Sequence, residues 1–246
     1  MEIGIKELLK TYKSKEAGLK ALERHKSIFP IKPSSNLAGI VGDLMGDGHL
    51  QGKPYLRLDY TSKSKKELKR FEKIFFDVFK VKGKIRKCTT NKYGTFNYGV
   101  NCKPIARALY LFGVPTGAKV LKKFLIPKWI LSNKVFFASF VRRLFDCEGT
   151  IDMKSKYIEI QMYKNTKIIE DGIDFFQEIK ENLDKYFNIK STNPFLDNAR
   201  SHRKDGIKTR PVRLKIKKKD SLKNFAHYIN FDTLYKKERL DFILKE

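Results

Sequence analysis

The sequence predicts an α+β protein made of two pseudo-symmetric tandem repeats, each in the order αββαββα with an antiparallel sheet. Two apolar stretches, 37–45 and 136–145, have the residue spacing of buried helices. Each stretch leads to an acid followed by a glycine, Asp47-Gly48 in the first and Glu148-Gly149 in the second. Because strand and helix patterns then follow in the same order, we interpret the chain as an internal repeat with a period of about one small domain.

The first repeat is preceded by residues 1–34, where two short helices are expected to form an N-terminal helical extension. Pro30 and Pro33 separate this extension from the first apolar stretch, which a Ser or Asn at 34–36 can cap. The further elements of this repeat are expected as strands at 55–61, 84–90 and 95–101, with a turn at 91–94, and as helices at 65–79 and 104–112. Residues 113–130 are expected to join the repeats, so the first repeat with its joining segment occupies 35–130.

The second repeat, with the C-terminal helix, is expected to occupy 131–246. Ser132 or Asn133 can cap its first helix, and Gly48 and Gly149 are expected to end the two apolar helices in the left-handed conformation. The further elements are expected as strands at 151–153, 157–163, 189–195 and 209–217 and as helices at 166–187, 221–231 and 233–244.

The net charge is the strongest global property of the chain. Its 53 Lys and Arg against 27 Asp and Glu give a charge of +26 and a pI of about 9.9. Such an excess indicates a polyanionic partner, most often nucleic acid, with a ribosomal protein, an RNA chaperone or a membrane-surface protein as alternatives. Since no apolar run is long enough to span a bilayer and no signal-peptide pattern is present, we expect a protein without a membrane partner in the cytoplasm, associated with the nucleoid, or in an organelle.

The two acids are the candidate metal ligands. Cys88, Cys102 and Cys147 lack CxxC spacing, and the histidines lack a metal-ligand spacing, so neither a zinc site nor a disulfide framework is expected. A helix C-terminus carries partial negative charge, and a divalent cation can bind a carboxylate there together with free backbone carbonyls. The alternative is that each acid is merely solvated beside a capping glycine, which the presence of two matched helices disfavours.

The first helix also has a face of small residues, because Ala38, Gly42 and Gly46 are four apart. Such a face lets another helix approach closely, and the second apolar helix is its natural partner. With this face and the paired acids, the chain resembles the LAGLIDADG homing endonucleases in their single-chain, two-motif form. The motifs are 40–48 and 141–149, with Asp146 at the earlier, non-catalytic acid position. Arg143 replaces a motif glycine, and Cys147 and Ser139 stand at other small positions.

The resemblance implies a function, a cofactor and site residues. It implies that the motif helices pack at the repeat interface, that the two sheets form a DNA-binding saddle, and that Asp47 and Glu148 are catalytic. It also implies Mg²⁺, or another divalent cation such as Mn²⁺, bound by these acids and the carbonyls of Gly46 and Cys147. Basic residues near the scissile phosphates are matched by Lys63, Lys164 and Lys217.

A two-stranded ribbon fits the DNA major groove, so the polar faces of the strands are expected to meet duplex DNA. The side chains that we expect to contact DNA are Arg57, Arg86, Thr89, Asn97, Lys156, Gln161, Arg200, Arg210, Arg213 and Lys215. Each of these alone could belong to an ordinary solvated strand face, but the net charge argues against this for the set.

The leading interpretation is therefore a site-specific, intron-encoded homing endonuclease that makes a metal-dependent double-strand cut. Because both motifs are on one chain, we expect a monomer. Two alternatives remain: an RNA maturase on the same fold, which would bind intron RNA, and a non-cleaving DNA-binding protein. An intein is not expected, because the chain starts at Met1 and ends Lys245-Glu246 without a splicing nucleophile or a His-Asn pair.

Overall fold

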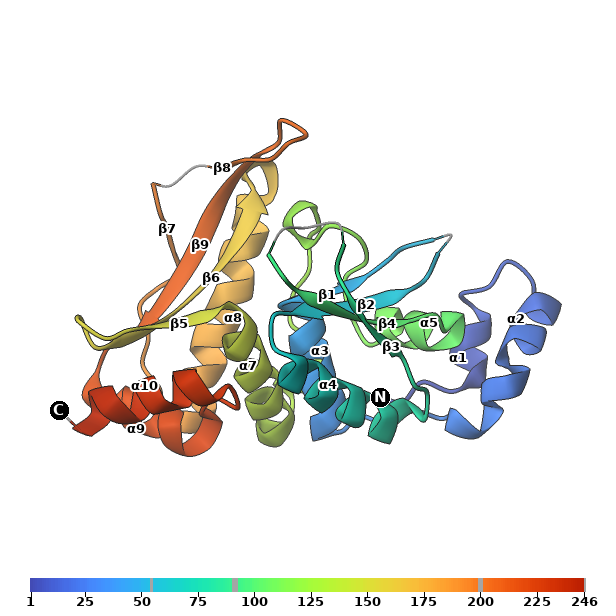
Figure 1. Cartoon of the computed structure of the whole chain (residues 1–246), viewed down its shortest axis with the longest axis horizontal. Helices are drawn as coiled ribbons and strands as arrows, with labels where there is room; N and C mark the ends of the chain where they lie inside the picture. Colours follow the sequence, from blue (N-terminus) through green and yellow to red (C-terminus); the bar gives the residue numbers. More distant parts are fainter. Residues whose placement is uncertain (54, 90–92, 199–200, 246) are drawn as a thin grey trace. The chain divides into compact units, whose positions relative to one another are not determined.

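The computed structural model confirms the α+β class and shows two compact units, Met1–Gly117 and Ala118–Glu246 (Figure 1). The structure describes residues 1–53, 55–89, 93–198 and 201–245. Each unit contains an antiparallel sheet with helices against one face, as the two-repeat prediction requires. Among the described residues, no helix combines the length and the apolar character needed to cross a membrane.

The first unit begins with the short helices of the N-terminal extension and continues with the predicted order of helix and strands. Its elements are α1 (Ile5–Leu9), α2 (Lys15–Leu22), the 3₁₀ helix Glu23–Ile28, α3 (Ser35–Met45), β1 (Gly48–Leu50), β2 (Leu58–Ser62), α4 (Lys65–Phe79), β3 (Lys84–Lys87), β4 (Phe96–Val100) and α5 (Lys103–Leu111). The sheet order is β1-β2-β4-β3, and all pairs are antiparallel. The predicted turn at 91–94 lies in part outside the described residues.

Strand alternation places the core of the first unit between its sheet and α4. Tyr60 and Tyr98 are cross-strand partners on the covered face, and both are buried. Phe71 stacks on Tyr60 with ring centroids 4.4 Å apart, and Phe75 continues this aromatic row towards the end of α4. The opposite face of the sheet is open and polar.

The second unit repeats this plan with longer elements. They are the 3₁₀ helix Lys119–Leu121, α6 (Lys128–Leu131), α7 (Lys134–Glu148), β5 (Gly149–Asp152), β6 (Tyr157–Asn165), the 3₁₀ helix Thr166–Ile168, α8 (Ile169–Phe187), β7 (Phe195–Leu196), β8 (Ser201–His202), β9 (Lys208–Ile216), α9 (Lys219–Asn224), the π-helical turn Phe225–Ile229 and α10 (Leu234–Lys245). The sheet order is β5-β6-β9-β7, with β8 also paired to β9. α7 and α8 contact β6, and of the predicted strand 189–195 only its end forms β7.

The joining segment packs with the second unit. The sequence predicts that residues 118–130 belong with the first repeat, but in the structure they are part of the unit Ala118–Glu246. The Phe124 N–H donates to Asp171 Oδ1 (2.9 Å), and the Ile126 N–H donates to Glu178 Oε2 (2.8 Å). Both acids lie on α8. Side chains of this helix therefore accept hydrogen bonds from backbone N–H groups of the joining segment, in place of a neighbouring strand.

We expect the aromatic row to dominate the stability of the first unit. Phe71→Ala removes a fully buried ring and should lower the free energy of unfolding by about 3–5 kcal/mol. Phe76→Ala, on the same helix but 36% exposed, should change it by only about 0.5 kcal/mol. Urea unfolding, monitored by hydrogen exchange of the first-unit amides, measures both changes. An equal loss of unfolding free energy in the two variants would contradict the assigned core.

Candidate functional site

At the C-terminal end of each motif helix, an acid directly precedes an edge strand of the sheet in the same unit. α3 is capped by Gly46, whose N–H donates to the Gly42 carbonyl (2.9 Å), and the exposed Asp47 leads from this cap into β1. α7 ends at Glu148 itself, which is half-buried, and β5 starts at Gly149. The N-terminal caps are Ser34 for α3 and Asn133 for α7, both within the predicted choices.

The glycine after each acid is required by space, and not by a left-handed backbone. A Cβ on Gly48 would lie 2.6 Å from Leu44 Cδ2 and 2.7 Å from Leu44 Cα, and a Cβ on Gly149 would overlap the Phe145 carbonyl oxygen. Gly149 has φ −82°, and the described glycines with positive φ lie elsewhere, so the expected left-handed helix ends are wrong. Each helix therefore turns into its strand so tightly that the acid is held at the junction.

A buried polar cluster fixes the end of α7 to the start of α10. Lys236 Nζ donates to the carbonyls of Asp146 (2.6 Å) and Phe145 (3.2 Å). The Asp146 carboxylate accepts from Arg143 Nη1 (2.7 Å) and the Thr233 N–H (3.0 Å). The last carbonyls of a helix lack intrahelical partners and carry partial negative charge, so a buried ammonium satisfies them well. Burial raises the pKa of Asp146, although Arg143 opposes this shift.

Arg143, which replaces a glycine of the motif, belongs to this cluster. Its side chain is 5% exposed, and Nη1 also donates to Asp232 Oδ2 (2.8 Å). The long side chain is thus accommodated within the second unit. Asp146, the earlier acid of the motif, is occupied by these contacts and has a structural role.

In the first unit, Asp43 ties α3 to α4. Its carboxylate is 1% exposed and accepts from Arg70 Nη2 at 2.9 and 3.0 Å. The Tyr60 hydroxyl is a third contact at 3.4 Å, and Arg70 Nε donates to Glu67 Oε2 (3.1 Å). Removing one partner of such a pair would leave a buried charge uncompensated, which is strongly destabilising.

The three lysines expected near the cleavage centre have different environments. Lys63 and Lys217 are exposed and come directly after β2 and β9. Lys164 lies inside β6 on the covered face, is 2% exposed, and donates from Nζ to Asp171 Oδ2 (2.5 Å) and the Lys122 carbonyl (2.7 Å). Burial lowers the pKa of Lys164, although the Asp171 pairing opposes this shift. An ammonium enclosed in this way does not reach a DNA phosphate, so we leave Lys164 out of the site.

The open face of the first sheet carries a polar groove of about 220 Å³. Its lining residues are Arg57, Lys82, Gly83, Lys84, Arg86, Asn97, Gly99 and Asn101. Arg57, Arg86 and Asn97 are predicted contacts, and Thr89 is exposed just past β3. Lys84 was missed although it lies two residues from Arg86 in a strand, the spacing that places both on one face.

On the open face of the second sheet, the predicted cations surround a central acid. Glu159 is paired with Arg213 at 3.1 Å and with Lys215 at 2.9 Å, and Arg213 also pairs with Asp197. Gln161 lies opposite Arg213, and its Oε1 is buried without a hydrogen-bond partner in the described part of the chain. Buried side-chain acceptors without a partner are rare in folded proteins.

Three further predicted contacts have other positions. Lys156 is exposed in the β5–β6 turn with φ 50°, and Arg200 lies outside the described residues. Alternation along β9 places Arg210 with the buried Val212 and not with Arg213, and its guanidinium donates to the Asp197 carbonyl (2.9 and 3.1 Å). Arg210 therefore does not belong to the open face.

The donors at the two helix ends suit a hard divalent cation. Asp47 and Glu148 offer carboxylate oxygens, and Gly46 and Cys147 offer backbone carbonyls beside them. Magnesium prefers such oxygen ligands and usually keeps several waters or substrate phosphates in its shell. In the described ranges, no group of three or more His, Cys, Asp or Glu side chains could hold a metal ion.

No family model matches the chain, but two curated proteins of Methanocaldococcus jannaschii share sequence with it. Identity is 29% over 219 residues with glutamine–fructose-6-phosphate aminotransferase (isomerizing), covering 89% of this chain and 18% of that protein. It is 28% over 163 residues with replication factor C small subunit, covering 61% of this chain and 9% of that protein. The chain thus spans less than a fifth of the curated relatives that it matches.

Solved structures of LAGLIDADG homing endonucleases share the fold. I-DmoI in complex with DNA and Mn superposes with a TM-score of 0.52 at 20% identity, over 79% of this chain and 96% of that chain. I-WcaI bound to its DNA recognition sequence gives 0.54 at 15% identity, over 88% and 91%. The fold expected from the resemblance is therefore confirmed.

We expect the Lys236 cap to stabilise the second unit. Lys236→Met keeps the apolar stem but leaves the Phe145 and Asp146 carbonyls without their donor, which should lower the free energy of unfolding by about 1–3 kcal/mol. Lys237→Met, at the exposed neighbouring position, removes the same charge and should change it by about 0.5 kcal/mol. Denaturant unfolding of the two variants measures these changes. An unchanged free energy of unfolding in Lys236→Met would show that the Lys236 cap does not stabilise the second unit.

Proposed function

We propose that the protein is a site-specific homing endonuclease that cuts both strands of duplex DNA with the help of divalent cations. The observation that carries this proposal is the pair of matched helix ends, each placing one acid at a glycine-dependent junction with a sheet. The shared fold with I-DmoI and I-WcaI, both solved with DNA, supports it.

The proposal gives the following roles to the residues described above. Asp47 and Glu148 would hold Mg²⁺ or Mn²⁺ together with the carbonyls of Gly46 and Cys147. Such an ion, when bound, activates water and stabilises charge at a phosphodiester. The groove of the first sheet and Gln161, Arg213 and Lys215 of the second bind the duplex, while the exposed Lys63 and Lys217 contact phosphates near the cut.

The sequence relatives support a self-contained module that occurs in different protein contexts. The matched segment forms 18% of an aminotransferase and 9% of a replication factor subunit, two proteins with unrelated names and activities. A module that spreads by cutting DNA at new sites would be found in such unrelated hosts.

Both acids are on one chain, so we propose that it cuts as a monomer, in contrast to enzymes that need a second subunit to complete their site.

Loss of either acid should separate cutting from binding. Asp47→Asn and Glu148→Gln remove the carboxylate charge with little change of shape, so double-strand cleavage should fall below detection while DNA binding stays within about threefold of the parent. Glu238→Gln, an exposed position on α10, is the matched control and should cut normally. Cleavage is measured on gels with Mg²⁺ and, as substrate, the DNA locus of the host without the inserted gene. A parallel assay measures binding to the same DNA. Full cutting by both variants would refute the proposed site, and binding without cutting by the parent would favour a DNA-binding protein.

Binding to duplex DNA should depend strongly on salt. If the two sheet faces neutralise about ten phosphates, the logarithm of the association constant should fall with the logarithm of the salt concentration at a slope of roughly −9. Titrations at several salt concentrations give the slope. A value near zero would mean that the +26 charge serves something other than the DNA backbone.

A further inference from the structure

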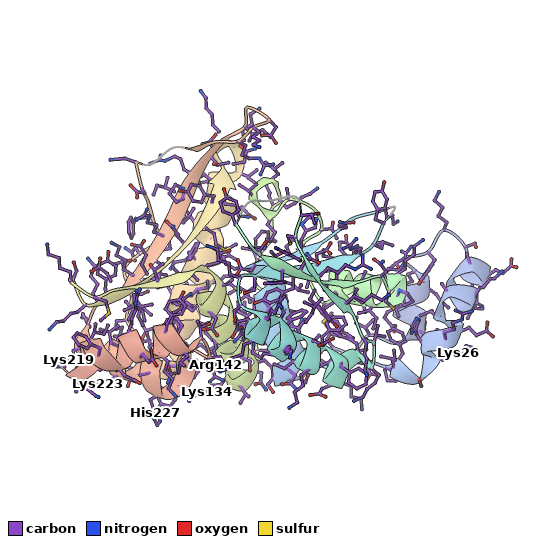
Figure 2. All side chains as sticks on the ribbon, in the orientation of Figure 1. Lys26, Lys134, Arg142, Lys219, Lys223 and His227 are labelled. Atoms are coloured by element: carbon purple, nitrogen blue, oxygen red, sulfur yellow. The ribbon has the colours of Figure 1, made fainter. Side chains whose placement is uncertain are left out.

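Cations and aromatic rings form a second surface on the helical side of the second unit, made by α7, α8, α9 and the π-helical turn. We call it the helical patch, and it consists of Lys134, Lys185, Tyr186, Lys219, Lys223, His227 and Tyr228. Figure 2 shows Lys219, Lys223 and His227 following one another along this side, with Lys134 next to His227. None of these residues is on a strand, so the patch is separate from the open face of the sheet.

The buried ring of Phe187 links the rings of the patch into a row. Tyr186 and Phe187 have centroids 6.1 Å apart, Phe187 and Tyr228 are 5.4 Å apart, and Tyr228 and His227 are 4.5 Å apart. Lys134 Nζ lies 5.1 Å from the Phe187 centroid and 4.9 Å from that of Tyr228. Aromatic surface and positive charge are therefore interleaved at close range.

The π-helical turn exposes this part of the row. Phe225 and Ile229 are buried, whereas Tyr228 is 39% exposed and His227 is exposed beside it. The turn is closed by the Asn230 N–H, which donates to the Phe225 carbonyl (2.7 Å). Arg142 Nε on α7 donates to the Ile229 carbonyl (2.5 Å), so a residue of the motif helix holds the turn in place. π-turns inside helices are often found at functional sites.

The lysines of the patch differ from three cations of the sheet faces in their ion pairing. Arg57, Arg213 and Lys215 on the open faces are each paired with a carboxylate. In the part of the chain that the structure describes, no ion pair involves Lys134, Lys185, Lys219 or Lys223. The patch therefore presents lysines whose positive charge is available to an anionic partner.

We propose that the helical patch binds single-stranded nucleic acid, with its lysines on the phosphates and unpaired bases stacked on Tyr228 and His227. Stacking platforms combined with cations bind single strands with little sequence preference, because every base has a flat face. In a duplex these faces are covered by neighbouring bases, so the bases of a duplex could not stack on the rings of Tyr228 and His227. This activity is independent of DNA cleavage and does not rest on the proposed endonuclease function.

The test is fluorescence anisotropy with labelled oligo(U) and oligo(dT), in the presence of excess unlabelled duplex to occupy the sheet faces. Tyr228→Ala should weaken binding roughly 5- to 150-fold, the effect of losing one stacked base, while Tyr228→Phe keeps the ring and should bind like the parent. Lys134→Glu and Lys223→Glu should each weaken binding more than Lys26→Glu, the same charge change at an exposed lysine of the first unit (Figure 2).

The outcomes separate clearly. If the parent binds either oligonucleotide and the variants bind it more weakly as expected, the helical patch is the binding site. The oligonucleotide that binds more tightly shows whether the patch prefers RNA or DNA. Three results would overturn it: Tyr228→Ala binding like the parent, Lys26→Glu losing as much as Lys134→Glu, or complete displacement of the oligonucleotides by the duplex. A melting curve of each variant checks the fold, and the exposed lysine variants keep the test valid if Tyr228→Ala does not fold.

Discussion

The passage of a buried helix directly into an edge strand is the constraint on which the site depends. Gly48 and Gly149 leave no space for a Cβ, so in each unit the chain can turn from helix to sheet only through a glycine. The acid before each glycine is consequently held at a helix end, where backbone partial charge is negative. A bound cation would offset this unfavourable interaction between the acid and the helix end.

The two units hold their motif helices by different polar contacts. In the first, Asp43 inside α3 pairs with Arg70 of α4, so the helix is tied along its side. In the second, Lys236 binds the last carbonyls of α7, and Arg143 joins Asp146 below them. The pseudo-symmetry therefore applies to the backbone plan and the position of the acids, whereas the side chains that support the two helices differ.

Local patterns predicted the fold and the positions of Asp47 and Glu148 at the helix–strand junctions, because caps, helical spacing and the acid–glycine pairs are all contained within short segments. Ser34 and Asn133 are examples. Errors arose where the answer depends on strand ends or distant partners. The predicted strand 157–163 is two residues shorter than β6, which runs to Asn165, so Lys164 falls outside the predicted strand although it lies on the covered face of β6. Lys236 could not be assigned from sequence, because its partners are on α7, far away in the chain.

The central claim is that both helix-end acids bind the catalytic cation at the DNA. Anomalous diffraction from crystals of the protein with target duplex and Mn²⁺ tests this directly, because manganese can be located independently of the protein atoms. Anomalous peaks are expected within ligand distance, about 2 Å, of carboxylate oxygens of both Asp47 and Glu148. Peaks that contact neither acid, with the duplex bound on the sheet faces, would contradict it.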